Sequence, residues 1–192
     1  MPSSDKNSYF DTDKIEPHGY FQSYMKLAAE IGPRGKVIEL GVQNGESLRI
    51  WQSLFPLGDI TGIDLDKNAT WPEGTKKIVS EQNDIGLLAE LDENQTYDLI
   101  VDDASHDGGI TQQSWMILWQ KLKPGGYYVI EDWQVALRFD DHWGACYGPS
   151  MLKTAETFLT MLTERNGQIE EITYRYGLII IKKNPEYVPG NA

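Results

Sequence analysis

Acidic side chains and one histidine gather in a single stretch of the chain, YDLIVDDASHDGGITQQSWMILWQKLKPGGYYVIED. One hydrophobic run ends in Asp102 and Asp103, His106 follows shortly after it, and a second hydrophobic run ends in Glu131 and Asp132. Carboxylate oxygens are ligands that Mg²⁺ prefers, and a neutral imidazole accepts protons near pH 7. The stretch therefore predicts a divalent cation beside a general base, which together could remove a proton from a hydroxyl group.

The two acid pairs can meet only at one edge of a sheet. An amphipathic helix and a Lys-Pro-Gly-Gly turn join the two hydrophobic runs, so we expect the runs to be neighbouring parallel strands. The carboxyl ends of parallel strands share one edge, and open α/β sheets bind their ligands at that edge.

A glycine loop precedes these strands. The run 36–40 predicts a buried strand, Gly41 and Gly45 lie in the loop after it, and a helix is expected from Glu46 to about Phe55. Glycines let a ligand approach the backbone, and the helix N-terminus offers free N–H groups, so this unit is typical of nucleotide-cofactor sites. The glycine spacing matches neither the dinucleotide motif G-x-G-x-x-G nor a P-loop.

The next predicted strand, 59–64, ends in an acid. We expect Asp64 to bind the ribose hydroxyls of a cofactor, because a carboxylate at this distance from a glycine loop has that role in cofactor-binding sheets. The alternative is that Asp64 and Asp66 are solvated loop acids.

A weaker third strand is predicted at 76–79. Glu81 and Gln82 follow it and either face the adenine of a cofactor or belong to a capping loop. Asp84 is predicted to cap a helix that runs to Leu91.

The remaining segments complete an α/β pattern. Helices are expected at 20–31 and 151–165, and strands at 169–174 and 177–182. Two strands in succession break the βα alternation and indicate an antiparallel hairpin that closes the sheet. The aromatic-rich segment 133–150 has no clear period and is expected to be a substrate loop.

Length and composition limit the function classes. The 192 residues predict a single domain, 1–192, and the formal charge of −12 argues against nucleic acid and anionic membranes as partners. Cys146 is the lone cysteine, which excludes an internal disulfide and a cysteine-based zinc cluster. We find no signal peptide or membrane-spanning run and expect a soluble cytoplasmic protein.

Six acids are predicted at strand ends on the same side of the sheet: Glu39, Asp64, Asp102, Asp103, Glu131 and Asp132. Packing them together costs several kcal/mol unless cations or shared protons offset the repulsion. A ribose, a cationic cofactor and Mg²⁺ (or Mn²⁺ or Ca²⁺) would satisfy them, and oxygen ligands make zinc less suitable. The alternatives are an acidic rim without a metal and, for His106, a helix-cap role.

Several motifs resemble those of class I S-adenosylmethionine (SAM)-dependent methyltransferases. They are Glu39-Leu40-Gly41 with Gly45, Ser47-Leu48-Arg49, Gly62-Ile63-Asp64 and Pro124-Gly125-Gly126. More narrowly, the chain is similar to the metal-dependent macrolide sugar O-methyltransferases of the mycinamicin VI type. That similarity is carried by Thr12-Asp13-Lys14, His18-x-Tyr20, SLRIW, VDDASH and GGYYVIEDW.

The resemblance implies a fold and a set of roles. The expected fold is a Rossmann-like, seven-stranded, mostly parallel sheet with an antiparallel last strand and helices on both faces. Asp103, Glu131 and Asp132 match magnesium ligands, and His106, beside Asp103, matches the catalytic base. The expected SAM contacts are Lys14, His18, Tyr24, Glu39, Gly41, Ser47, Asp64, Leu65, Glu81, Gln82 and Asp102. The segment 1–32 is expected to cover the cofactor.

The implied reaction is Mg²⁺-dependent O-methylation of a hydroxyl on a sugar or a glycosylated small molecule. The sequence departs from the family pattern in two ways: we expect no segment of these 192 residues to be long enough for the additional N-terminal domain of the larger macrolide enzymes, and Ala104 replaces a usual glycine. The assembly state is left open, with a homo-oligomer as one option. The alternatives are methylation of a catechol-like or other diol, a cephalosporin-hydroxylase-like relative, and a SAM-binding protein without catalysis. A nicotinamide oxidoreductase is disfavoured because the dinucleotide motif is absent.

Overall fold

The computed structural model describes residues 14–15, 18–91, 94, 96–137, 150–163 and 167–187. Within these ranges the α-helices are α1 (Phe21–Ile31), α2 (Glu46–Leu54), α3 (Leu87–Glu90), α4 (Gly108–Leu118) and α5 (Met151–Thr163). The strands are β1 (Val37–Leu40), β2 (Ile60–Asp64), β3 (Thr75–Val79), β4 (Tyr97–Asp102), β5 (Leu122–Glu131), β6 (Ile169–Arg175) and β7 (Leu178–Lys183). Two 3₁₀ helices, η1 (Trp119–Lys121) and η2 (Trp133–Leu137), flank β5.

The strands form one seven-stranded sheet in the order β3-β2-β1-β4-β5-β7-β6. Strands β1 to β5 pair in parallel, and β7 runs antiparallel to both β5 and β6. This arrangement confirms the predicted α/β sheet with its antiparallel last strand.

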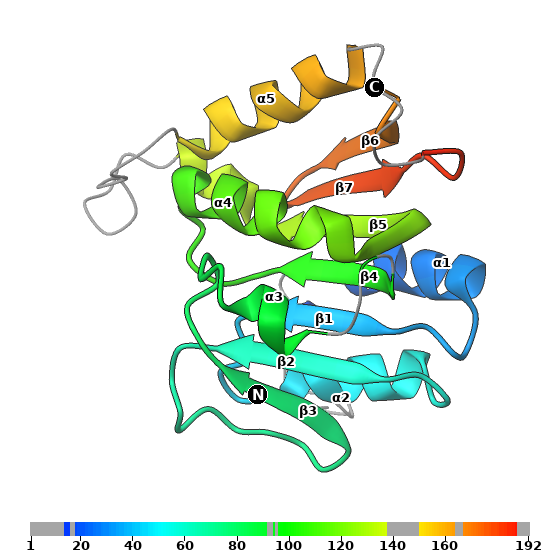
Figure 1. Ribbon diagram of the computed structural model, residues 1–192, viewed down its shortest axis with the longest axis vertical. Coiled ribbons are helices and arrows are strands. Elements are labelled where there is room, and N and C mark those ends of the chain that lie inside the picture. The colour runs from blue at the N-terminus through cyan, green and yellow to red at the C-terminus, as the bar shows by residue number, and fades with distance from the viewer. Residues whose placement is uncertain are drawn as a thin grey trace, which may run out of the picture.

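Helices cover both faces of the sheet (Figure 1): α4 lies in front of it, α5 packs against α4 and β6, and α1 and α2 lie behind it. Successive side chains of a strand point to opposite faces of the sheet, so each face has its own hydrophobic core. In β1, Ile38 and Leu40 belong to the cluster that contains Trp115 of α4, and Val37 belongs to the cluster that contains Trp51 of α2. Glu39 is fully buried in the same strand.

The register of the central strands brings the acids together. Asp102 at the end of β4 is level with Leu40 of β1 and with Ile130 of β5. Asp103 and Glu131 therefore lie one residue further along neighbouring strands. The prediction that the two acid-ending strands are parallel neighbours is confirmed.

The prediction for Asp84 was wrong. The helix there is the four-residue α3, its N-cap is Gly86, and no side chain caps it. Asp84 instead closes a turn, with Oδ1 accepting a hydrogen bond from the Gly86 N–H at 2.8 Å. A side chain that bonds the backbone two residues on favours this turn over a longer helix.

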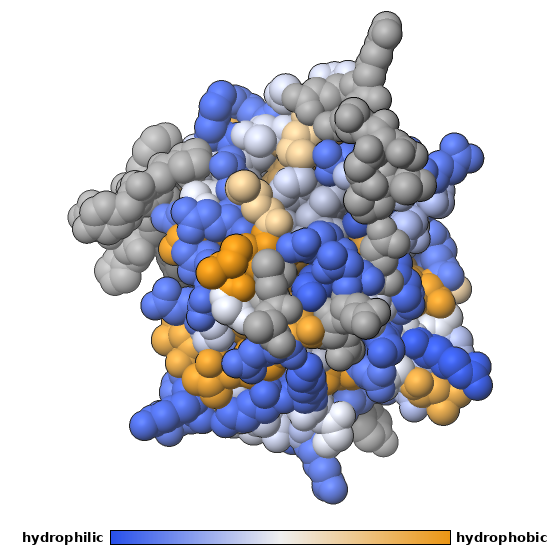
Figure 2. All heavy atoms as spheres, viewed as in Figure 1, coloured by the Kyte–Doolittle hydropathy of each residue, from blue (hydrophilic) through white to orange (hydrophobic). Residues whose placement is uncertain are grey.

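The face of the molecule that carries α4 and α5 is largely hydrophilic, and its apolar side chains lie in small separate groups (Figure 2). This agrees with the spread of the net charge of −12 along the chain. Among the residues that the structure describes, no helix is long and apolar enough to cross a membrane.

Candidate active site

Lys14 lies at the centre of the strand-end acids. Its side chain is 1% exposed, and its ammonium donates to Oδ2 of Asp103 at 2.5 Å and to Oε1 of Glu131 at 2.9 Å. Oε1 of Glu39 is 3.4 Å away. Burial by itself lowers the pKa of Lys14, but the three negative charges outweigh burial and raise this pKa well above its ordinary value. One charged ammonium thus joins acids from three neighbouring strands.

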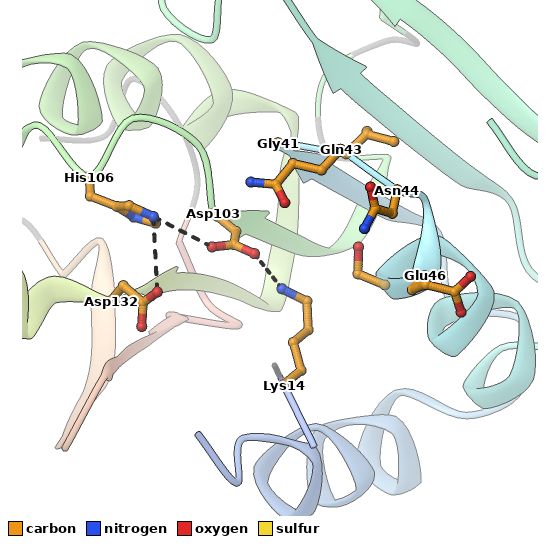
Figure 3. A pocket seen from close by; sticks show the side chains of 10 residues that line it. Lys14, Gly41, Gln43, Asn44, Glu46, Asp103, His106 and Asp132 are labelled. Atoms are coloured by element: carbon orange, nitrogen blue, oxygen red, sulfur yellow. Dashed lines mark hydrogen bonds and ion pairs between the residues drawn. The ribbon is translucent and has the colours of Figure 1, made fainter. Parts of the chain in front are cut away.

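A second group of side chains adjoins Asp103 (Figure 3). Nε2 of His106 lies 4.0 Å from Oδ1 of Asp103 and 3.9 Å from Oδ2 of Asp132. One ligand atom from each of the three residues lies within 4.8 Å of the other two. Two carboxylates beside one imidazole fit Mg²⁺ with a nearby base, because Mg²⁺ takes mainly oxygen ligands and keeps several waters.

Asp132 is held in place from several directions. Its Oδ1 accepts hydrogen bonds from the Tyr20 hydroxyl at 2.6 Å and from Nε2 of Gln134 at 3.0 Å, and Nδ1 of His18 is 3.5 Å away. Burial by itself raises the pKa of Asp132. The hydrogen bonds from Tyr20 and Gln134 and the interactions with His18 and His106 outweigh burial, so this pKa is lower than usual. Asp132 is therefore ionised at neutral pH.

Three non-glycine residues in the described ranges have a left-handed backbone: Gln43 with φ of 46°, and His106 and Asp132 with φ of 53° each. This conformation is uncommon for residues other than glycine and persists only where the surroundings enforce it. All three border a cavity of about 230 Å³ whose lining also includes Lys14, Gly41, Val42, Asn44, Glu46, Ser47 and Asp103. The backbone strain is thus concentrated around one cavity.

Two buried acids contact residues that line this cavity. Oε2 of Glu39 accepts a hydrogen bond from the Ser47 hydroxyl at 2.6 Å, and Oε1 of Glu131 accepts one from the Tyr24 hydroxyl. Both acids are at most 2% exposed. Burial, the largest effect for each, raises the pKa of Glu39 and of Glu131. The Lys14 ammonium opposes this shift and favours the charged carboxylates.

The glycine loop lies against both Asp103 and Asp64. Gly41 has φ of 87°, and a Cβ at this position would overlap the carbonyl oxygen of Asp103, so the close approach requires glycine. Oδ2 of Asp64 accepts hydrogen bonds from the N–H groups of Val42 at 2.7 Å and Gln43 at 3.0 Å. Asp64 therefore shapes the loop, and its remaining lone pairs are available to a ribose.

A second cavity, of about 410 Å³, shares Gly41, Gln43 and Asp103 with the first. Its lining also includes Ile63, Asp64, Leu65, Glu81, Gln82, Asn83, Ala104, Ser105 and Ile110. The volume lies within the range of small-molecule and cofactor sites, and the lining combines apolar walls with a few polar groups. These residues fit a nucleoside-containing cofactor next to the group formed by Asp103, His106 and Asp132.

The structure brings most of the predicted site residues to these two cavities. Lys14, Gly41, Ser47, Asp64, Leu65, Glu81, Gln82, Asp103, His106 and Asp132 line one or both of them. Tyr24, Glu39, Asp102 and Glu131 are buried and bonded within the protein, and His18 lies beside Asp132. Glu131 is outside the Asp103–His106–Asp132 group, so its role as a metal ligand stays a prediction, as do the cofactor contacts. Most of the expected substrate loop, residues 138–149, lies outside the described residues.

Sequence reasoning missed several side chains of this region. Gln43, Asn44 and Glu46 line the smaller cavity, and the Tyr20 hydroxyl bonds Asp132. The motif His18-x-Tyr20 contained a signal for Tyr20. Nothing in the types of Gln43 and Asn44 distinguishes them from ordinary loop residues, and only their place beside Gly41 could have indicated a role.

The sheet order, the glycine loop after β1 and the acid at the end of β2 define a class I SAM-dependent methyltransferase fold. The chain is related to macrolide sugar O-methyltransferases. It is 36% identical over 106 residues to the mycinamicin VI 2''-O-methyltransferase of Micromonospora griseorubida, which is 50% of this chain and 27% of the relative. It is 31% identical over 147 residues to the 8-demethyl-8-alpha-L-rhamnosyl tetracenomycin-C 2'-O-methyltransferase of Streptomyces olivaceus, which is 71% of this chain and 38% of the relative.

A solved structure has the same fold. The MycE methyltransferase of the mycinamycin biosynthetic pathway, in complex with Mg, SAH and mycinamycin VI, superposes with a TM-score of 0.74 at 24% identity. The superposition covers 92% of this chain and 52% of that chain. The chain thus spans less than half of the two curated relatives and about half of the solved one. No protein-family model matches it.

Proposed function

We propose that this protein is a Mg²⁺-dependent SAM O-methyltransferase that methylates a hydroxyl group of a sugar or a glycosylated small molecule. The observation that carries the proposal is the meeting of Asp103, His106 and Asp132 at a cavity that also borders the glycine loop. A metal-ligand group and a cofactor loop on one cavity would place an activated hydroxyl next to a methyl donor.

His106 is the proposed general base. Its imidazole lies between Asp103 and Asp132, and these carboxylates would stabilise the imidazolium that forms when Nε2 takes the proton of the acceptor hydroxyl. Asp103 and Asp132, with Glu131 as the further predicted ligand, would hold Mg²⁺, which when bound lowers the pKa of a hydroxyl group near it.

The glycine loop and Asp64 are the proposed cofactor contacts. Gly41 lines both cavities and lets the loop lie against Asp103, and Asp64 lines the larger cavity, where the ribose would lie. The cofactor, when bound, supplies the methyl group. The contribution of the chain is to hold the two reactants in line, which can supply about 7 to 11 kcal/mol of the barrier reduction.

The relatives support the acceptor class. The curated relatives are named as methyltransferases of mycinamicin VI and of a rhamnosyl tetracenomycin, and MycE was solved with Mg, SAH and mycinamycin VI. The rhamnosyl group in the second name is a sugar, and the MycE complex holds the mycinamycin VI that the first name gives as the substrate. A glycoside hydroxyl is therefore preferred here to a catechol-like diol.

Calorimetry tests the proposal. SAM is titrated into the purified protein with and without Mg²⁺, and Mg²⁺ is titrated separately, for the wild type, Asp103→Ala and the surface control Asp59→Ala. We expect micromolar SAM binding by all three proteins and a Mg²⁺ signal that only Asp103→Ala loses. An acceptor screen with methyl-labelled SAM over glycosides and simple diols would follow.

Each result has a defined meaning. Absence of SAM binding would overturn the methyltransferase. SAM binding without a Mg²⁺ signal, even with a glycoside present, would overturn the metal-dependent mechanism. Methyl transfer to diols but not to glycosides would replace the sugar acceptor with the catechol-like one.

A further inference from the structure

Gln82 uses its side-chain amide entirely within the protein. Nε2 donates to Oδ1 of Asp102 at 3.0 Å and to Oγ of Ser114 at 2.9 Å. Oε1 accepts a hydrogen bond from the N–H of Ser105 at 2.8 Å. The residue is 8% exposed, although it lies in the loop after an edge strand. Its two amide N–H groups and its carbonyl thus already have partners.

The partners of Gln82 flank the proposed catalytic residues. Asp102 directly precedes Asp103, and Ser105 directly precedes His106. One amide therefore holds both ends of the segment 102–105, and the bond to Ser114 ties this segment to helix α4. The segment is also fixed on its other side, where the N–H of Asp103 donates to the carbonyl oxygen of Leu40 at 3.0 Å.

The conformation of His106 requires such support. Its φ of 53° costs about 1 kcal/mol or more for a residue with a Cβ, so neighbouring contacts must impose it. Asp107 supports the following residues, because its carboxylate caps α4 through the N–H groups of Gly109 and Ile110. Gln82 supports the preceding residues. The histidine is therefore held between two anchored neighbours.

We propose that Gln82 is a positioning residue that fixes the segment carrying Asp103 and thereby sets the affinity of the site for Mg²⁺. This role rests on the proposed function and deepens it. It also differs from the adenine contact that the sequence predicted for Gln82, because the two roles affect different ligands. Loss of an adenine contact weakens cofactor binding, whereas loss of a positioning residue weakens metal binding. Residues that orient metal ligands typically change metal affinity by about 10- to 100-fold.

The test compares two glutamine variants. Gln82→Met keeps the length of the side chain and removes its hydrogen bonds. Gln112→Met makes the same change on α4, where the Gln112 amide bonds the hydroxyls of Thr154 and Thr157 at 3.2 and 3.3 Å. Mg²⁺ is titrated calorimetrically into each protein at saturating S-adenosylhomocysteine, and S-adenosylhomocysteine is titrated in a separate experiment.

We expect Gln82→Met to raise the Kd for Mg²⁺ by about 10-fold or more, which is a larger factor than any rise in the Kd for S-adenosylhomocysteine, whose proposed cavity Gln82 also lines. Gln112→Met should change neither constant by more than about twofold. If Gln82→Met does not fold, Ser114→Ala, which removes one of the Gln82 partners, should weaken Mg²⁺ binding in the same direction.

Three outcomes would overturn the proposal in distinguishable ways. Weaker S-adenosylhomocysteine binding with unchanged Mg²⁺ binding would assign Gln82 to the cofactor. Unchanged binding of both ligands would leave Gln82 without a role at the site. The absence of Mg²⁺ binding in the wild type would overturn the metal site of the proposed function and the role of Gln82 with it.

Discussion

The ammonium of Lys14 lies 2.5 Å from Oδ2 of Asp103, although 89 residues separate the two in the chain. The same ammonium bonds Glu131 and lies 3.4 Å from Glu39. Three acids from three strand ends therefore share one internal cation, which comes from the segment before α1. The N-terminal segment thus contributes directly to the electrostatics of the candidate active site.

Removal of this cation should destabilise the protein. Lys14→Met leaves buried carboxylates without their counter-ion, and breaking a buried ion pair costs about 3 to 5 kcal/mol. Urea unfolding in the presence of a chelator measures the change. Lys36→Met is the matched control, because Lys36 pairs at 3.2 Å with Asp59, whose side chain is 72% exposed, and should cost no more than about 1 kcal/mol. Equal effects of the two substitutions would contradict the central role of Lys14.

Replacement of His106 should affect catalysis far more than cofactor binding. His106→Ala removes the proposed base, and general-base catalysis contributes about 10²- to 10⁴-fold to the rate. We expect a loss of that size in kcat on a glycoside acceptor, with the Kd for S-adenosylhomocysteine unchanged within about twofold. A loss of less than about threefold would mean that another group takes the proton.

Gly177 should be intolerant of a side chain. It has φ of 78° in the turn between β6 and β7, and a Cβ there would overlap the hydroxyl of Tyr20, which bonds Asp132. Gly177→Ala should therefore cost the left-handed strain plus about 1 to 3 kcal/mol of steric overlap. Gly125→Ala is the control, because Gly125 has φ of 79° and the nearest atom to an added Cβ, on Pro185, is 3.8 Å away. Urea unfolding measures the loss of unfolding free energy for each variant, and the difference between the two losses is the cost of the steric overlap. Equal losses would contradict the predicted overlap with Tyr20.

Lys183, which is far from the candidate site, should make the stability of the protein depend on pH. Its ammonium donates to the carbonyl oxygens of Trp119 and Leu122, and burial lowers its pKa from 10.5 to about 8. Between these two values the unfolded chain binds the proton more strongly than the folded chain, so stability rises with pH across this window. The rise is at most about 3 kcal/mol, and less where water screens the ammonium.

Urea unfolding of the wild type and of Lys183→Met across this range checks the prediction. Other groups titrate in both proteins, so the difference between the two curves isolates Lys183. We expect the unfolding free energy of the wild type to rise relative to that of the variant from pH 8 to pH 10.5. A difference that stays constant or falls would contradict the lowered pKa.

The sequence alone determined the architecture and the location of the candidate site. The hydrophobic runs with acids at their ends predicted the strands, and the two successive C-terminal strands predicted the hairpin, because local periodicity and turn residues encode such elements. Asp103, His106 and Asp132 were predictable as one group, since the carboxyl ends of neighbouring parallel strands must share an edge.

Only the tertiary structure decided which of these side chains contact one another and which line a cavity. Lys14 was predicted to contact the cofactor, and the fold places it among Asp103, Glu131 and Glu39. Gln82 was predicted near the adenine, and its amide is bonded to Asp102, Ser105 and Ser114. These contacts join segments that are distant in the chain, and side-chain direction and burial arise only when the sheet and its helices pack together. Residue type and spacing therefore indicate which groups can do chemistry, and the packing determines which of them face one another.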